Sequence, residues 1–191
     1  SLCCGSIFGQ EKNVVNAAIA KMNLFLHGAS DFNVMQGDTL RDPKILQGGN
    51  IAKFDCVIAN PPFSLENWGA TEWSSDKYKR NIYGTPSDSC GDYAWIQHMI
   101  CSMSSGKGRM AVVMPQGILF RGNQEAEIRK QLVESDLIEA VVTLGDKLFY
   151  GTGLSPCFLI IRRMKQAHHS GRILMIDGSK ILTQKRAQNI L

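Results

Sequence analysis

Short apolar segments alternate with longer segments of helical periodicity along this 191-residue chain. Such alternation is typical of strands joined by crossover helices into a mostly parallel sheet, so we expect an α/β fold. Helices are predicted from the cap Asn13 to about His27, from the cap Asp92 to about Ser102, and over Gln124–Val133. The predicted strands are Ile7–Glu11, Phe32–Gln36, Phe54–Ala59, Arg109–Met114, Ile138–Leu144 and Cys157–Arg162, with Ile173–Asp177 as a further candidate.

The length of the chain and the spacing of its last strands predict one domain with a mixed sheet. A chain of this length fits a single α/β domain, and no repeat or interdomain linker interrupts residues 1–191. The turn Gly151-Thr152-Gly153 precedes the strand Cys157–Arg162, and no helix is predicted between this strand and the strand Ile138–Leu144. Consecutive strands joined by a turn run in opposite directions, so we expect an antiparallel strand near the carboxyl end.

Composition excludes some classes of protein and leaves others open. Apolar residues make up 44% of the chain, but their longest runs are too short to span a bilayer. No secretory leader opens the sequence, so we expect a cytoplasmic protein without a membrane partner. The net charge of +4 permits a polyanionic partner without requiring one. The six cysteines form no CxxC pair and no cluster with histidine, so we predict reduced thiols and no metal site.

Polar side chains follow three of the predicted strands at the point where each strand ends. They are Glu11, Asp38 and Asn60. In open α/β sheets, ligands bind outside the carboxyl ends of the strands, so we expect these three residues to share one ligand-binding edge. The plainer interpretation makes Glu11 an acid at a helix start and Asp38 a turn residue.

Asn60-Pro61-Pro62-Phe63 is the most unusual short motif in the chain. Two consecutive prolines cannot continue a β-ladder, and they fix the backbone directly after the strand Phe54–Ala59. The side chain of Asn60 and the carbonyl of Pro61 would therefore present two hydrogen-bond acceptors in set directions, with the ring of Phe63 beside them. The plainer alternative is a rigid turn that only ends the strand.

A long polar segment, residues 64–90, follows the motif and contains Trp68, Trp73, Tyr78 and Tyr83. A loop of this length inside a domain is usually functional or disordered. Basic residues also lie near the predicted ligand-binding edge, although a solvated surface is the simpler interpretation for each of them: Arg41, Lys44, Lys53, Lys77, Lys79 and Arg80.

The chain resembles a known family of enzymes through this motif and the segments around it. Asn-Pro-Pro-Phe resembles the catalytic motif of amino-methyltransferases that use S-adenosylmethionine. Further segments resemble the modification subunit of type I restriction–modification systems, which is an adenine-N6 DNA methyltransferase. These segments are Phe8–Glu11, Ala20–Leu24, His27-Gly28, Gly37–Leu40, Phe54-Asp55, Asp92–Ala94, Gly117–Gly122, Ile128–Lys130 and Leu148–Gly153.

The resemblance implies a Rossmann-like methyltransferase sheet and a role for each site residue. Asn60, Pro61, Pro62 and Phe63 are the expected catalytic residues, which would hold and stack a flipped-out adenine while its amino group accepts the methyl group. Glu11 is expected to bind the ribose hydroxyls of S-adenosylmethionine, Asp38 to lie beside the cofactor's adenine, and Asn60 also to border the cofactor. The implied partners are DNA, a specificity subunit that reads the DNA sequence, and a restriction subunit.

The chain departs from the family pattern before Glu11. The family has a first strand and a glycine-rich turn there, whereas this sequence offers only Cys4-Gly5-Ser6. We therefore expect the 191 residues to be a partial catalytic domain that lacks the first strand and its turn, either as a fragment or through an internal deletion. On its own, such a chain is expected to bind the cofactor poorly and to be inactive.

Two alternatives remain open. Some RNA guanine-N2 methyltransferases also use an Asn-Pro-Pro-Phe motif, although the segments after Asp92 favour the DNA enzyme. A shortened copy could also serve as a non-catalytic part of an assembly. The sequence contains nothing that specifies the DNA target, because the family assigns that task to another subunit.

Overall fold

The computed structural model describes residues 6–149, 153–181, 183–184 and 189–190. It divides the chain into two units, residues 1–52 and residues 53–191. Two parts of the sequence interpretation lie outside the described residues: Cys4 and Gly5 at the expected opening of a glycine-rich motif, and Tyr150–Thr152 in the predicted turn. The prediction of a single domain over residues 1–191 stays a prediction.

The first unit begins with a β-α-β segment made of β1 (Ile7–Glu11), α1 (Val14–Leu26) and β2 (Phe32–Gln36). β1 and β2 pair in parallel, with Ile7 opposite Phe32 and Glu11 opposite Gln36. The predicted cap is confirmed, because Oδ1 of Asn13 accepts hydrogen bonds from the backbone N–H of Val15 (2.9 Å) and of Asn16 (3.1 Å). All three elements lie within one residue of the ranges that the sequence predicted.

A short hairpin, which the sequence analysis missed, completes this unit. Its strands β3 (Leu46–Gln47) and β4 (Asn50–Ile51) pair antiparallel. Gly48 and Gly49 form the turn with φ of +57° and +78°, a conformation that glycine adopts without steric strain. The Gly-Gly pair was therefore the signal from which this turn could have been found.

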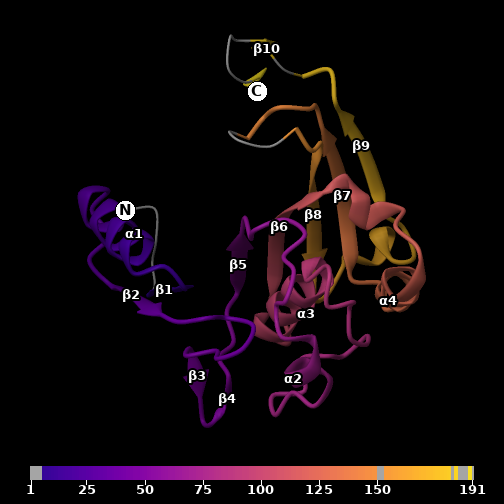
Figure 1. Ribbon diagram of the computed structural model, residues 1–191. Coiled ribbons are helices and arrows are strands. Elements are labelled where there is room, and N and C mark those ends of the chain that lie inside the picture. Colours follow the sequence, from indigo (N-terminus) through magenta and orange to yellow (C-terminus); the bar gives the residue numbers. More distant parts are fainter. Residues whose placement is uncertain (1–5, 150–152, 182, 185–188, 191) are drawn as a thin grey trace. The chain divides into compact units, whose positions relative to one another are not determined.

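The second unit is built on a five-stranded mixed sheet in the order β5-β6-β8-β7-β9 (Figure 1). Its strands are β5 (Cys56–Ala59), β6 (Arg109–Pro115), β7 (Ile138–Leu144), β8 (Pro156–Arg162) and β9 (Leu174–Gly178). β5 is parallel to β6, and β7 is parallel to β9, whereas β8 lies between β6 and β7 and is antiparallel to both. The predicted antiparallel strand near the carboxyl end is thereby confirmed.

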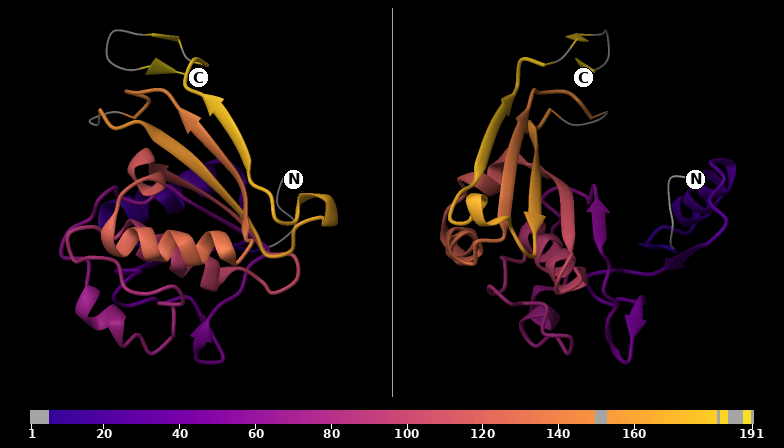
Figure 2. Two further views of the ribbon diagram at one scale, coloured as in Figure 1. Left: turned by 90° about the vertical axis from the view of Figure 1, so that its right-hand side faces the viewer. Right: turned by 180° about the vertical axis from the view of Figure 1, so that it is seen from behind.

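One face of this sheet is covered by α3 (Asp92–Ser102) and α4 (Asn123–Glu134), and Figure 2 shows both helices alongside the strands. Alternate residues of β6 and β8 point into the core between the sheet and the helices: Met110, Val112, Met114, Cys157, Leu159 and Ile161. The residues between them, Ala111, Val113, Phe158 and Ile160, are only half-buried. This period of two is the alternation expected of a sheet with one covered face.

The remaining elements are short. The helix α2 (Ala70–Ser74) lies in the polar segment after the Asn60 motif, and 3-10 turns occupy Gln116–Leu119 and Ala167–His169. β10 (Thr183–Gln184) and β11 (Asn189–Ile190) pair antiparallel. Within the described ranges no helix combines the length and the apolarity that crossing a bilayer requires.

Candidate active site

The Asn60–Phe63 motif begins directly after the last residue of β5, as the sequence predicted. Pro61 is buried, which anchors the turn, whereas Asn60 is exposed. Within the part of the chain that the structure describes, the side-chain amide of Asn60 has no hydrogen-bond partner. Its oxygen is therefore available to accept a hydrogen bond from a bound molecule.

The carboxyl end of the motif is tied to the start of α3. Ser64, the residue after Phe63, has a φ of 51° and donates its backbone N–H to Oδ1 of Asp92 at 2.8 Å. One residue later, the carbonyl of Leu65 accepts a hydrogen bond from the N–H of Gly91 at 3.0 Å. The motif is thus fixed by a buried proline on one side and by hydrogen bonds to the 91–92 segment on the other.

Phe63 contributes an aromatic ring beside Asn60. The ring is half-buried and meets Phe149 edge to face, with the ring centroids 6.3 Å apart and the planes at 85°. Phe149 belongs to the segment that follows β7, and so the contact joins two connections that follow the carboxyl ends of strands. The neighbouring Tyr150 lies outside the described residues.

A pocket of about 330 Å³ lies beside the motif, where β6 ends. Phe120 on its wall is 74% exposed, so its ring is accessible from solvent. The pocket is lined by Ser64, Pro115, Gln116, Gly117, Phe120, Arg121, Leu154 and Ser155. β5 and β6 are parallel, and the pocket therefore occupies the edge where ligands of α/β sheets bind.

Glu11 and Asp38 lie near each other in the first unit. Glu11 ends β1, opposite Gln36 near the end of β2, and Asp38 follows two residues later. Oε1 of Glu11 accepts a hydrogen bond from the N–H of Asn13 at 2.8 Å. Both acids thus follow the carboxyl ends of parallel strands, as predicted. Asn60 belongs to the second unit, so the expectation that all three residues share one edge stays a prediction.

The carboxylate of Asp38 is strongly bound. Oδ2 forms an ion pair with Nζ of Lys12 at 2.9 Å, and Oδ1 accepts the N–H of Leu40 and of Arg41 at 3.1 Å and 3.2 Å. Partial burial opposes ionisation, but the hydrogen bonds from Lys12 and from the backbone outweigh it and lower the pKa of Asp38. Asp38 is therefore an anion that organises the turn after β2.

Arg80 is a structural residue, although it was one of the basic residues considered for the neighbourhood of the ligand. It is 1% exposed, and its guanidinium donates to Oδ1 and Oδ2 of Asp76 at 2.8 Å and 3.0 Å. The same group lies over the ring of Trp73, 4.5 Å from its centroid. Trp68 and Trp73 are each 2% exposed, which means that neither indole can stack on a nucleic-acid base unless the segment rearranges.

His98 of α3 completes this buried cluster and makes it sensitive to pH. Burial first, and the positive charge of Arg80 second, lower the pKa of His98 to about 3, while Asp76 acts in the opposite direction. The neutral ring accepts a hydrogen bond from Nη1 of Arg80 at Nδ1, at 3.2 Å. On unfolding, the pKa returns to its ordinary value of 6.5. Between these two values His98 is protonated in the unfolded chain but neutral in the folded chain. The free energy of unfolding therefore decreases as the pH falls from 6.5 towards 3.

Replacing His98 with glutamine should make the stability of the protein less dependent on pH in the acid range. The amide oxygen can still accept from Arg80, but it does not titrate in this range. We expect the melting temperature of the wild type to fall more steeply than that of His98→Gln between pH of about 6.5 and about 4. His168→Gln, at an exposed histidine, is the control and should follow the wild type. Parallel profiles for wild type and His98→Gln would contradict this assignment.

Comparison with known proteins gives one family. The model of the family described as N-6 DNA Methylase matches residues 4–191. A type I restriction enzyme MjaVII methylase subunit from Methanocaldococcus jannaschii is 36% identical over 181 residues, which are 91% of this chain and 30% of that protein. The chain thus spans about a third of the length of the curated relatives that it matches.

Solved structures agree with this result. The type I restriction-modification methyltransferase subunit from Streptococcus thermophilus matches with a TM-score of 0.87 and 30% identity, over 97% of this chain and 39% of that one. A putative class I S-adenosylmethionine-dependent methyltransferase from Listeria monocytogenes matches with a TM-score of 0.64 and 15% identity, over 91% of this chain and 50% of that one. The second likeness shows the fold alone, and it supports the predicted Rossmann-like methyltransferase class.

Proposed function

The chain belongs to the N-6 DNA methylase family, and from this we propose that it is the methyl-transferring part of an adenine-N6 DNA methyltransferase, the modification subunit of a type I restriction–modification system. The methyl donor in this proposal is S-adenosylmethionine, and the acceptor is the amino group of an adenine that is flipped out of the duplex. The relatives are methylase subunits of type I restriction enzymes, and so the protein would work with a specificity subunit and a restriction subunit.

The observation that carries the proposal is the exposed, unpartnered amide of Asn60 on a loop that is fixed at both ends. The lone pair of an adenine amino group is delocalised into the ring, which makes the nitrogen a weak nucleophile. Oδ1 of Asn60 and the carbonyl of Pro61 would each accept one amino hydrogen and favour a pyramidal nitrogen whose lone pair points at the methyl donor. Phe63 would stack on the base, which contributes roughly 1–3 kcal/mol.

The remaining chemistry requires little more than positioning. The donor supplies an electrophilic methyl group on a sulfonium, so one N–C bond forms, one S–C bond breaks, and the amino group releases one proton to water. The fixed loop would hold the nitrogen in line with the methyl group, and orientation of this kind can account for much of a rate enhancement. We therefore assign Asn60 to the binding of the adenine that accepts the methyl group, and its side chain would also lie next to the bound S-adenosylmethionine.

Glu11 fits the task of binding the cofactor's ribose. Its carboxylate is half-buried at the end of β1, and one of its oxygens is engaged by the N–H of Asn13. Within the described part of the chain the second oxygen has no hydrogen-bond partner, so it can accept from a sugar hydroxyl. Asp38, which already organises the turn after β2, would lie beside the adenine of the cofactor.

The runner-up enzyme is an RNA guanine-N2 methyltransferase, because such enzymes share the short motif and would hold the guanine amino group in the same way. The family match over residues 4–191 favours the DNA enzyme. A non-catalytic role in assembly is the second alternative, and an Asn60 amide that is exposed on a fixed loop, with no partner among the described residues, argues against it.

Nucleoside analysis of cells that express the protein tests the proposal. The protein as its gene encodes it would be expressed together with its specificity subunit in a host that has no adenine methylation. DNA and ribosomal RNA would then be hydrolysed and analysed by mass spectrometry. We expect N6-methyladenine in the DNA. New N2-methylguanine in ribosomal RNA would support the runner-up instead, and no methylated base in either would leave the non-catalytic role.

A further inference from the structure

Asp92 holds the end of the Asn60–Phe63 loop with a fully buried carboxylate. Its exposed fraction is 0%, and its two oxygens have different partners. Oδ1 accepts a hydrogen bond from the backbone N–H of Ser64 at 2.8 Å, and Oδ2 accepts a hydrogen bond from Nη2 of Arg121 at 2.6 Å. Burying a carboxylate costs free energy unless it is paired and hydrogen-bonded, and these two contacts offset that cost for Asp92.

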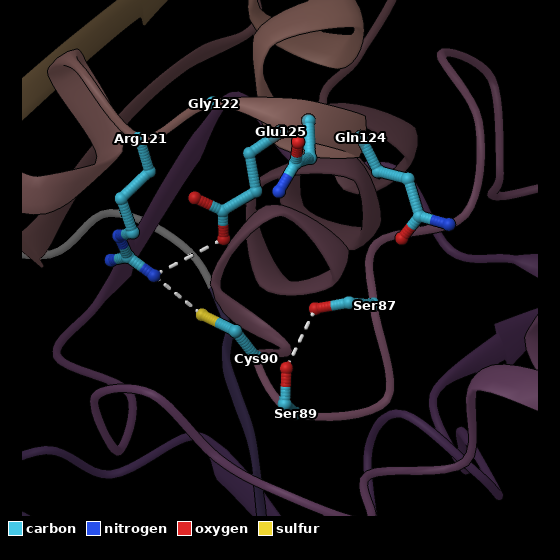
Figure 3. Close-up of a pocket in the computed structure, with 8 residues that line it drawn as sticks. Ser87, Ser89, Cys90, Arg121, Gly122, Gln124 and Glu125 are labelled. Atoms are coloured by element: carbon cyan, nitrogen blue, oxygen red, sulfur yellow. Dashed lines mark hydrogen bonds and ion pairs between the residues drawn. The ribbon is translucent and has the colours of Figure 1, made fainter.

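Arg121 is itself held by several groups, and Figure 3 shows two of them, Cys90 and Glu125. Its Nη1 donates to Oε1 of Glu125 at 3.1 Å and to Sγ of Cys90 at 2.6 Å. Its backbone carbonyl accepts a hydrogen bond from Nη1 of Arg129 at 2.8 Å. The planar guanidinium thus has one orientation that satisfies all of these groups, and that orientation sets the position of Oδ2 of Asp92.

The same cluster also has the spacing of a metal site, since the ligand atoms of Cys90, Asp92 and Glu125 lie within 4.8 Å of one another. The guanidinium of Arg121 touches all three and already supplies a positive charge. Burial raises the pKa of the Cys90 thiol to about 11 and also raises the pKa of Glu125, and the raised values favour the neutral forms. The cluster is therefore organised around the Asp92–Arg121 ion pair, and among the described residues only Oε1 of Glu125, not its buried Oε2, has a hydrogen-bond partner.

The backbone at Ser64 explains why the loop needs this support. A residue other than glycine with a φ of 51° is in the left-handed region, a strained conformation that persists only where the surroundings hold it. The hydrogen bond to Asp92 is at this residue, directly after Phe63. Without the carboxylate, Ser64 can relax to a negative φ, and that rotation would displace Phe63 and the residues before it.

We propose that Asp92 and Arg121 are positioning residues for methyl transfer, because the buried Asp92 carboxylate, oriented by Arg121, holds Ser64 and thereby the reactive geometry of Asn60 and Phe63. Neither residue touches the reacting atoms. The inference rests on the proposed function, in which this loop holds the acceptor amino group. Through Asp92 and Arg121, the segments Asp92–Ala94 and Gly117–Gly122 would therefore position the Asn60–Phe63 loop in addition to packing in the core.

A pair of aspartate variants separates positioning from stability. Asp92→Ala removes the support of Ser64, and Asp76→Ala is the matched control, since Asp76 is a buried carboxylate that accepts the N–H of Arg80 and its guanidinium but has no contact with the loop. The enzyme would be assembled from the full-length protein, as its gene encodes it, and the specificity subunit. The assay would follow the transfer of the methyl group from labelled S-adenosylmethionine to unmethylated DNA in a single turnover. Both variants should lower the melting temperature.

Only Asp92→Ala should lower the transfer rate, by roughly 10²-fold, because small displacements of reacting groups have effects of that size. The affinity for S-adenosylmethionine should stay within about threefold of the wild type, which places the loss in the transfer step. Asp92→Asn, whose single amide oxygen can accept from Ser64 or from Arg121 but not from both, should recover only part of the rate.

Equal transfer rates for Asp92→Ala and Asp76→Ala, measured on folded protein, would overturn the inference. If Asp92→Ala does not fold, folded Arg121→Met decides, because it keeps the Asp92 carboxylate that Ser64 contacts and removes only the guanidinium that orients it. A transfer rate of Arg121→Met within threefold of the wild type, at unchanged cofactor affinity, would then overturn it, and a loss of roughly 10²-fold would support it. A wild type that transfers no methyl group would contradict the proposed function itself.

Discussion

Replacing Asn60 with alanine should lower the rate of adenine methylation by about 10³-fold, without loss of stability. The estimate follows from the effect of removing one hydrogen-bonding group that acts on the reacting centre, which is about 10²–10³ in rate. Asn60 is exposed and its amide has no partner within the described residues, so its removal breaks no contact of the folded chain. The rate would be measured under single-turnover conditions, and the melting temperature by circular dichroism.

The control is Asn50→Ala, at an exposed asparagine of the β3–β4 hairpin, which should methylate DNA like the wild type. If Asn60→Ala lost less than tenfold in rate, the assignment of the acceptor site to this loop would be wrong. If it unfolded, Asn60 would be shown to have a structural role.

Replacing Arg80 with methionine should destabilise the second unit by about 3–5 kcal/mol, the usual effect of removing one partner of a buried ion pair. The variant leaves the carboxylate of Asp76 buried without its cation and also removes the guanidinium that lies over the ring of Trp73. Both effects act on the folded state alone. Urea unfolding followed by tryptophan fluorescence would measure the change in the free energy of unfolding.

Lys79→Met is the matched control, because it removes a positive charge one residue away from an exposed side chain. Surface substitutions of this kind usually change stability by less than about 0.5 kcal/mol. Equal stabilities for the two variants would show that the Asp76–Arg80 pair contributes no more to stability than a surface ion pair. The packing of Trp68 and Trp73 would then be what stabilises the segment after the motif.

Periodicity and turn chemistry were sufficient to predict most of the secondary structure. Strands such as Ile138–Leu144 have β-branched and apolar residues between clear breaks, and Asn13 and Gly28 define α1 at both ends. Periodicity does not say which apolar positions a fold buries. In α1, for example, Ala17 is buried, whereas the apolar residues Val14, Met22 and Phe25 are exposed.

The role of Asp92 could not be predicted from local sequence. We interpreted it as the cap of α3, which was wrong, because Gly91 is the N-cap residue and forms no side-chain cap. The carboxylate of Asp92 instead pairs with Arg121 and with the N–H of Ser64, partners that are 29 and 28 residues away along the chain. Likewise, a charge pattern alone made Arg80 a surface candidate, and only the positions of Asp76 and Trp73 show it to be buried.

The motif itself could be predicted because its chemistry is local. Two prolines fix their own backbone whatever surrounds them, and a residue that directly follows a parallel strand must lie at the sheet's carboxyl edge. Asn60 was therefore placed correctly at the end of β5. That Glu11 and Asp38 join it at one edge depends on contacts over long sequence separations, and it stays a prediction.

Methyl transfer requires the donor to be bound, so calorimetric titration with S-adenosylmethionine is the most direct measurement on this protein. The full-length protein, as its gene encodes it, should bind S-adenosylmethionine with a micromolar dissociation constant. Glu11→Ala should weaken binding by about 10- to 100-fold, which is the usual effect of losing one hydrogen bond to a charged group. Glu127→Ala, at an exposed glutamate of α4, should bind like the wild type. The absence of binding by the wild type, or equal binding by Glu11→Ala, would contradict the assignment of this chain to S-adenosylmethionine-dependent methyl transfer.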